Sequence, residues 1–153
     1  MRPTPHSYQT QQVMTASPAK LVAMLYERAI LSLKEAVRAI EAGDVEARFN
    51  ANQRAGEIVT HLWTTLDRDR GGEIADNLGR LYGFMLGRLT YVDVRNDPEP
   101  AREVIALLEP LRNSWDALAR GATAVPTEAA NAAAPANGPD RATAQLAKIS
   151  VSA

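Results

Sequence analysis

The chain has 153 residues, with 17 Lys or Arg against 18 Asp or Glu, and it contains no cysteine. This length suits one domain, and the near-zero net charge gives no general attraction to nucleic acid or to an anionic membrane surface. The missing cysteine excludes disulfides, thiolate metal sites and a cysteine nucleophile, and no run of about 18 apolar residues could span a bilayer, so we expect a cytoplasmic protein without membrane insertion.

Residues 17–41 open with a helix-start signal. Ser17 can accept hydrogen bonds from free backbone amides, and Pro18 suits the first helical position, where its missing N–H has no partner to lose. Apolar residues then recur with helical spacing up to Glu41. The face expected to enter a core carries Val22, Leu25, Ala29, Leu33, Ala36 and Ile40.

Three more helices are predicted after this one, over about 45–66, 73–94 and 99–120. The apolar stripe of the second contains Phe49, Ala55, Ile58, Leu62 and Leu66. A charged loop ending in glycine, residues 67–72, separates the second helix from the third, and Asn96, Asp97 and Pro98 mark the next boundary. Pro110 lies inside the fourth helix, where we expect a kink.

Four helices of similar length joined by short loops must pack antiparallel to their neighbours, since such loops cannot run the length of a helix. The sequence therefore predicts an all-α protein, an antiparallel up-down-up-down four-helix bundle. Residues 1–16 form an N-terminal arm, 17–120 the bundle, and 121–153 a flexible tail rich in Ala and Pro. Such a tail buries too little apolar surface to offset its ordering, although Leu146, Ile149 and Val151 could form a weak docking segment.

Two features exceed what a bundle core requires. Met24 and Leu31 fall on the charged side of the first helix, with Leu21 between that side and the core face, so they are either a partner surface or isolated surface apolar residues. In the third helix, Gly79, Gly83 and Gly87 recur every four residues, away from the apolar stripe. The row is either a groove for a partner helix or tolerated drift, because each interior glycine costs about 1 kcal/mol relative to alanine.

Signals of catalysis and of cofactor binding are weak. The chain has no Glu-x-x-His motif of the kind that holds metals inside helical bundles, and Glu57 with His61 is more typical of a solvated pair. Gly71 and Gly72 lack the preceding strand and the following Lys-Ser or Lys-Thr of a phosphate-binding loop. We therefore expect no enzyme activity, no metal, no cofactor and no nucleic acid partner.

Several strings, taken in order, resemble one known family. Tyr8-Gln9, Val13, residues 15–18 (TASP), Leu21 and residues 24–26 (MLY) resemble the opening of the FliS family of flagellin-specific export chaperones. The resemblance continues through residues 40–44 (IEAGD), 71–89 (GGEIADNLGRLYGFMLGRL), 95–97 (RND) and Trp115. The family usually has polar residues at the positions of Gly83 and Gly87 and commonly Tyr at that of Phe84, and the tail lies outside its pattern.

The resemblance implies a cytoplasmic helical bundle that binds the C-terminal segment of flagellin, keeps it from polymerising early and supports its delivery to the flagellar type III export apparatus. A component of the export gate is a second candidate partner, and we expect a monomer or a weak homodimer. The N-terminal arm would cover part of the binding surface when the partner is absent. Combined with the surplus apolar surface, the resemblance gives these candidate partner-binding residues: Tyr8, Val13, Leu21, Met24, Leu25, Leu31, Gly79 and Gly83.

Two alternatives remain open from the sequence. One is a generic helical-bundle interaction protein whose surplus apolar surface serves self-association. The other is a bundle enzyme with a metal or small-molecule site, which the missing Glu-x-x-His motifs disfavour.

Overall fold

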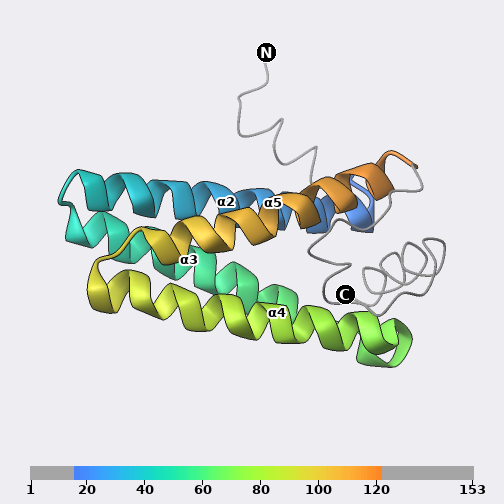
Figure 1. Ribbon diagram of the computed structural model, residues 1–153. Coiled ribbons are helices and arrows are strands. Elements are labelled where there is room, and N and C mark those ends of the chain that lie inside the picture. The colour runs from blue at the N-terminus through green and yellow to red at the C-terminus, as the bar shows by residue number, and fades with distance from the viewer. Residues whose placement is uncertain (1–15, 122–153) are drawn as a thin grey trace, which may run out of the picture.

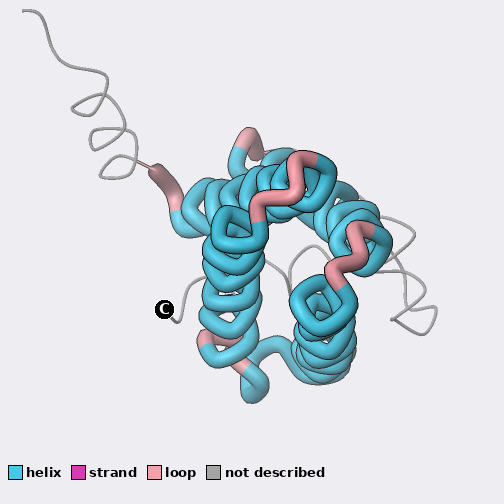
Figure 2. The backbone as a smooth tube through the Cα atoms, turned by 90° about the vertical axis from the view of Figure 1, so that its left-hand side faces the viewer, coloured by secondary structure: helices cyan, strands magenta, loops and turns pink. Residues whose placement is uncertain are grey.

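The computed structural model describes residues 16–121, and these form a bundle of four α-helices. The helices are α2 (Pro18–Glu41), α3 (Val45–Thr64), α4 (Arg68–Arg95) and α5 (Glu99–Ala119). Figure 1 shows them running lengthwise beside one another, and Figure 2 looks along the bundle from the end that holds the α2–α3 and α4–α5 connections. The predicted all-α fold is confirmed, whereas the predicted arm and tail lie almost entirely outside the described residues.

Three of the helices begin at capping side chains. Ser17 Oγ accepts from the Lys20 amide at 3.2 Å, and Asp44 Oδ1 accepts from the Ala47 amide at 3.0 Å. Asp67 Oδ1 accepts from the Arg70 amide at 3.1 Å. Each bond satisfies one of the amides that a helix start leaves free.

The third helix continues from residue 73, as predicted, but a further helical turn precedes it. Residues 68–71 were expected in a loop, but Asp67 caps a helical turn there, and α4 is assigned from Arg68 onward. Gly72 interrupts the helical backbone with φ +52° and ψ −130°, a conformation that glycine adopts with little steric cost. The charged residues around Gly72 therefore form a short helical turn joined to α4 through a bend.

The helix α5 runs without interruption from Glu99 to Ala119, so Pro110 does not end it, and the kink expected there stays a prediction. Proline has no N–H to donate to the carbonyl of Ala106, one turn earlier. Ala106 is exposed, so water can hydrogen-bond to its carbonyl instead. Pro98 occupies the N-cap position without a side-chain cap, and Asp97 Oδ1 accepts from the Glu99 amide at 2.9 Å.

The core confirms most of the predicted apolar stripes. In α2, Ala29, Leu33 and Ala36 are fully buried, while Val22, Leu25 and Ile40 are partly buried. Phe49 is an exception, because 49% of its surface is exposed. It stands six residues before Ala55, which places it about a third of a turn away from the buried stripe of α3.

Three polar aromatic residues meet at the centre of the core. The hydroxyl groups of Tyr26 on α2 and Tyr82 on α4 share a short hydrogen bond, and their ring centroids lie 6.5 Å apart. Burial raises the pKa of Tyr26 to about 12 and raises the pKa of Tyr82 well above its usual value. The indole N–H of Trp115 is buried beside them without a formed hydrogen bond, although it helps to moderate the rise in the Tyr26 pKa.

Ion pairs of alternating sign connect α2 to α5. The α2 members are spaced seven residues apart, which keeps them along one seam of neighbouring helices. The four N···O contacts are Lys20 with Asp116 at 3.0 Å, Glu27 with Arg112 at 2.7 Å, Lys34 with Glu109 at 3.8 Å and Glu41 with Arg102 at 3.3 Å. Because the early residues of α2 pair with the late residues of α5, the two helices are antiparallel, as expected for an up-down bundle.

Candidate helix-binding surfaces

The first candidate surface lies on α2. Leu21 and Leu31 are 37% and 43% exposed, as expected from the helical pattern, and Met24 and Leu25 are partly buried. The ion pairs with α5 follow one edge of this helix, and Glu35 pairs with Arg54 of α3 at 2.5 Å. The α2 surface, defined as Leu21, Met24, Leu25 and Leu31, is therefore bordered by paired charges, and it also contains the exposed Arg28 between Met24 and Leu31.

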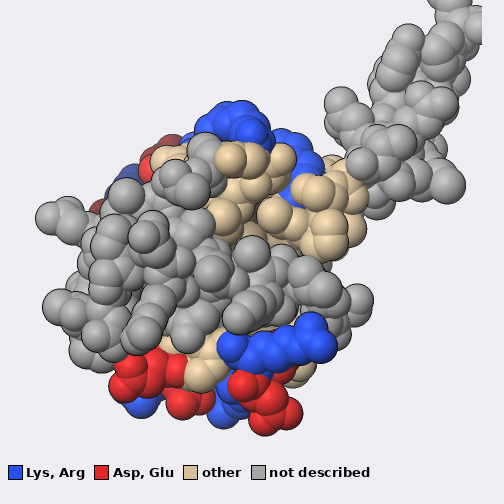
Figure 3. Space-filling model, turned by 90° about the vertical axis from the view of Figure 1, so that its right-hand side faces the viewer, with Lys and Arg blue, Asp and Glu red and all other residues tan. Residues whose placement is uncertain are grey.

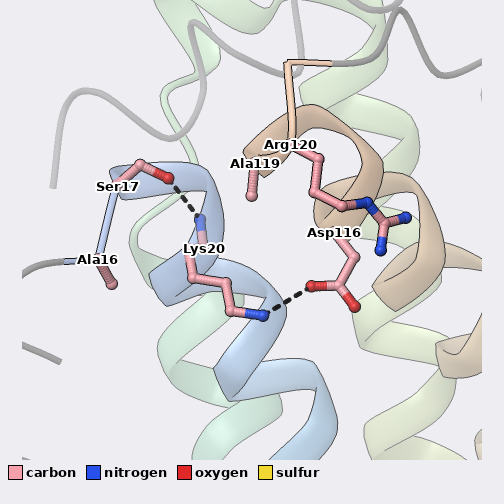
Figure 4. Close-up of a pocket in the computed structure, with 6 residues that line it drawn as sticks. All are labelled: Ala16, Ser17, Lys20, Asp116, Ala119 and Arg120. Carbon is pink, nitrogen blue, oxygen red and sulfur yellow. Dashed lines mark hydrogen bonds and ion pairs between the residues drawn. The ribbon is translucent and has the colours of Figure 1, made fainter. Parts of the chain in front are cut away.

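A shallow pocket lies where α2 begins and α5 ends (Figure 4). Ser17 and Lys20 line it from α2, and Asp116 and Arg120 from the end of α5. Lys20 Nζ bonds Asp116 Oδ1 across the opening, so the charges closest to the pocket largely satisfy each other. The arm residues Tyr8 and Val13, which the sequence assigns to partner binding, lie outside the described residues, and their role stays a prediction.

The same end of the molecule shows no dominant sign of charge. Figure 3 shows acidic and basic side chains side by side along the lower edge, where α4 begins. The sequence there alternates Asp67, Arg68, Asp69 and Arg70. Mixed charge of this kind offers little attraction to a nucleic acid backbone.

The glycine row of α4 faces a tryptophan of α3. A β-carbon placed on Gly79 would lie 3.4 Å from Trp63 Nε1, and one on Gly83 would lie 3.4 Å from the edge of the same ring. Gly87 has nothing within 4 Å of the corresponding position. Gly79 and Gly83 therefore let the indole lie close to the α4 backbone, and their predicted role in binding a partner stays a prediction.

The second candidate surface is a groove between α3 and α4, with a volume of about 510 Å³. Apolar side chains of α4 and small polar side chains of both helices line it. We call it the α3–α4 groove, and its residues are Asn52, Gln53, Gly56, Glu57, Thr60, Leu86, Leu89, Thr90, Asp93 and Val94.

A buried polar network closes one end of the α3–α4 groove. Asn52 Nδ2 donates to the Leu89 carbonyl at 2.9 Å and to Asp93 Oδ2 at 2.8 Å, and Arg48 Nε donates to Asp93 Oδ1 at 3.2 Å. Arg48 also reaches Asn96 Oδ1 at 2.5 Å. These bonds hold the antiparallel register of the two helices at this end.

Sequence reasoning missed the exposed apolar residues on the outer side of α4. Phe84 is 54% exposed and Val94 is 74% exposed. Tyr91 lies between the guanidinium groups of Arg88 and Arg95, which are 5.5 Å and 4.5 Å from its ring centroid. A helical wheel places these residues opposite the core stripe, so the signal was present in the spacing.

Within residues 16–121, no group of three or more His, Cys, Asp or Glu side chains is placed to hold a metal ion. No helix in that range is both long enough and apolar enough to cross a bilayer. The α2 surface and the α3–α4 groove both contain apolar side chains, which suit recognition of another helix.

Comparison with known proteins gives one consistent result. The family described as "Flagellar protein FliS" matches residues 1–122. The flagellar secretion chaperone FliS of Salmonella typhimurium is 40% identical over 104 residues, covering 67% of this chain and 77% of that protein. The proteins of the same name from Vibrio cholerae and Bacillus subtilis are 33% and 31% identical, covering 69% and 71% of this chain and 77% and 80% of their own lengths.

Proposed function

Because this chain belongs to the FliS family of flagellar proteins, whose similar members are flagellar secretion chaperones, we propose that it is a cytoplasmic export chaperone for flagellin. It binds the C-terminal segment of flagellin, prevents premature polymerisation and supports delivery to the flagellar type III export apparatus. The partner-binding residues include Leu21, Met24, Leu25 and Leu31, and the arm with Tyr8 and Val13 adjoins them.

The observation that carries this proposal is the exposure of the α2 surface. Leu21 and Leu31 are more than one-third exposed, although they lie on a helix whose core face is already complete. An amphipathic partner helix reads such a surface through apolar anchors spaced three or four residues apart. The partly buried Met24 adds a side chain that adapts to irregular partner surfaces.

The magnitude of the effect can be worked from burial. Fully burying an exposed leucine stabilises a complex by about 1.5–3 kcal/mol, but only 43% of Leu31 is exposed, so covering it contributes about 0.6–1.3 kcal/mol. Since about 1.4 kcal/mol changes an affinity tenfold, losing this contact should weaken binding of a partner helix on α2 by about three- to tenfold. In Leu31→Asp, covering the new carboxylate adds to that loss.

The test is calorimetric titration of the full chain with a synthetic peptide of the C-terminal segment of flagellin from the same organism. We expect binding at micromolar concentrations or tighter, and clear weakening by Leu31→Asp. Val45→Asp is the matched control, because Val45 is 58% exposed and lies at the far end of the bundle in the first turn of α3. Circular dichroism checks that both variants keep the fold.

Three outcomes separate the parts of the proposal. If the flagellin peptide does not bind at micromolar concentrations, the proposed function is wrong. If Leu31→Asp and Val45→Asp both bind the flagellin peptide as tightly as the wild type does, the function stands but the α2 surface is the wrong site. If light scattering shows a stable dimer that the peptide cannot dissociate, self-association accounts better for the apolar surface.

A further inference from the structure

One hydrogen-bond acceptor inside the α3–α4 groove has no partner. Asn52 is only 5% exposed, and its Oδ1 makes no hydrogen bond within residues 16–121. The amide cannot be turned to correct this, because Nδ2 already donates to the Leu89 carbonyl and to Asp93. Turning it would set Oδ1 against two acceptors. Less than 1 Å² of this oxygen is accessible, so it makes the groove wall polar but is not itself a contact point for a docked segment.

The groove itself has room for another segment. A β-carbon on Gly56 would meet nothing within 4 Å, so this side of α3 is open over the groove. The partly buried Leu86 and the exposed Val94 supply apolar surface, whereas Leu89 is buried in the core. Glu57 makes no ion pair within the described chain, so the site suits an apolar segment that brings one positive charge.

The last twelve residues of this chain have that chemistry. In residues 142–153, Leu146 and Ile149 are three apart, as on one face of a helix. The segment has a single charged side chain, Lys148, which complements Glu57. It lies outside residues 1–122, which the family match covers.

The connecting chain is long enough to reach the groove. α5 ends at Ala119, at the end of the bundle where α4 begins (Figure 1). Leu86 to Val94 lie about 30–40 Å along α4 from Arg68 at a rise of 1.5 Å per residue. Residues 122–141 span up to about 65–70 Å when extended. The tether therefore allows docking within one chain.

We infer that residues 142–153 dock in the α3–α4 groove of their own chain, with Leu146 and Ile149 against Leu86 and Lys148 beside Glu57. Attachment to the same chain supplies a high effective concentration, so even a weak contact is populated.

The chain has no cysteine, so a nitroxide spin label on Ser152→Cys marks the tail at one position only. Amide signals of isotope-labelled protein then report which residues the label approaches. We expect selective broadening at residues 53–60 and 86–94, with little effect along the seam between α2 and α5. Mixing spin-labelled chains with separate isotope-labelled chains should give no such broadening.

Two glycine variants make a matched pair. Gly56→Leu fills the groove, whereas Gly87→Leu adds the same side chain on the outside of α4, and neither new β-carbon meets another atom within 4 Å. Gly56→Leu should remove the broadening, as should the tail variant Leu146→Asp with Ile149→Asp, and Gly87→Leu should preserve it. The inference is overturned if the broadening is absent, uniform or centred on the α2 surface. It is also overturned if separate chains show the broadening or if Gly56→Leu leaves it unchanged.

A regulatory consequence rests on the proposed function. If flagellin also uses the groove, the docked tail competes with it, and the Leu146→Asp, Ile149→Asp variant should bind the flagellin peptide at least threefold more tightly. The spin-label result needs no flagellin, so docking can fail without affecting the proposed function. If the tail docks but the tail variant binds the flagellin peptide no more tightly than the wild type does, the tail and flagellin do not compete for the groove.

Discussion

Removing one hydroxyl from the buried tyrosine pair should destabilise the bundle more than its size suggests. Tyr82→Phe leaves the Tyr26 hydroxyl in a site where the Tyr26 side chain is 0% exposed, without its hydrogen-bond partner. A buried donor or acceptor that loses its partner costs about 1–3 kcal/mol. Tyr26→Phe should cost a similar amount, because the pair is reciprocal.

The double variant distinguishes this explanation from a simple loss of packing. When both hydroxyls are removed, neither is left without the other, and the ring contact at 6.5 Å between centroids remains. The indole N–H of Trp115 has no hydrogen bond in the wild type either, so it does not distinguish the variants. Replacing both partners with apolar groups of the same shape can be nearly neutral. The double variant should therefore be no less stable than either single variant.

Urea denaturation of all four proteins at neutral pH, followed by circular dichroism, measures the free energies of unfolding. Tyr91→Phe is the matched control, because Tyr91 is 38% exposed and its ring lies on the outside of α4. It should change stability by less than about 0.5 kcal/mol. If the effects of Tyr26→Phe and Tyr82→Phe add in the double variant to within about 0.5 kcal/mol, the two hydroxyls do not depend on each other and the reasoning is wrong.

Three further predictions follow from the same structure. The contribution of the neutral Tyr26 phenol to the free energy of unfolding should be fully present below pH 10 and should be lost as the pH rises toward 12. The reason is that burial raises the pKa of Tyr26 to about 12 from an ordinary value of 10.0, so the folded state keeps the phenol neutral. Denaturant midpoints of the wild type that stay constant between pH 10 and 12 would contradict this. Gly87→Ala should raise the free energy of unfolding by about 0.5–1 kcal/mol, since the added methyl meets no atom within 4 Å and alanine favours a helix; a loss of stability in urea denaturation would show that the open space is misjudged. Glu27→Arg should lower the free energy of unfolding by about 0.2–1 kcal/mol because the new arginine faces Arg112, and adding Arg112→Glu should restore most of this loss. Both effects should be smaller in high salt, which thermal melts at two salt concentrations can check. A double variant no more stable than Glu27→Arg alone would count against the pairing.

The sequence predicted the local features of this bundle well. Ser17, Pro18 and Asp44 act within one helical turn of themselves, so their effects do not depend on the rest of the fold. The exposure of Leu21 and Leu31 also followed from helical spacing on a single element. The family resemblance was visible in the order of short motifs and is confirmed by the match over residues 1–122.

Errors arose where a residue lay near the edge of a pattern. Phe49 was assigned to the buried stripe, but its place is about a third of a turn away, and the neighbouring Arg48 is buried there instead because it binds Asp93. The turn before Gly72 looked like a loop because charged residues and glycines usually end helices. An aspartate cap and a single glycine bend allowed one helical turn to form there.

The functional detail depended on which helix faces which, and this could not be read from any one segment. From the sequence, the row of Gly79 and Gly83 was either a groove for a partner helix or tolerated drift, and only the tertiary structure shows that the indole of Trp63 lies against both. The hydroxyls of Tyr26 and Tyr82 are 56 residues apart in the chain, and only the packing of α2 against α4 makes them partners. The unpartnered oxygen of Asn52 likewise results from where α4 places its acceptors. Periodicity and capping determine each helix because they act within a few residues, whereas contacts between distant segments are decided by the tertiary structure alone.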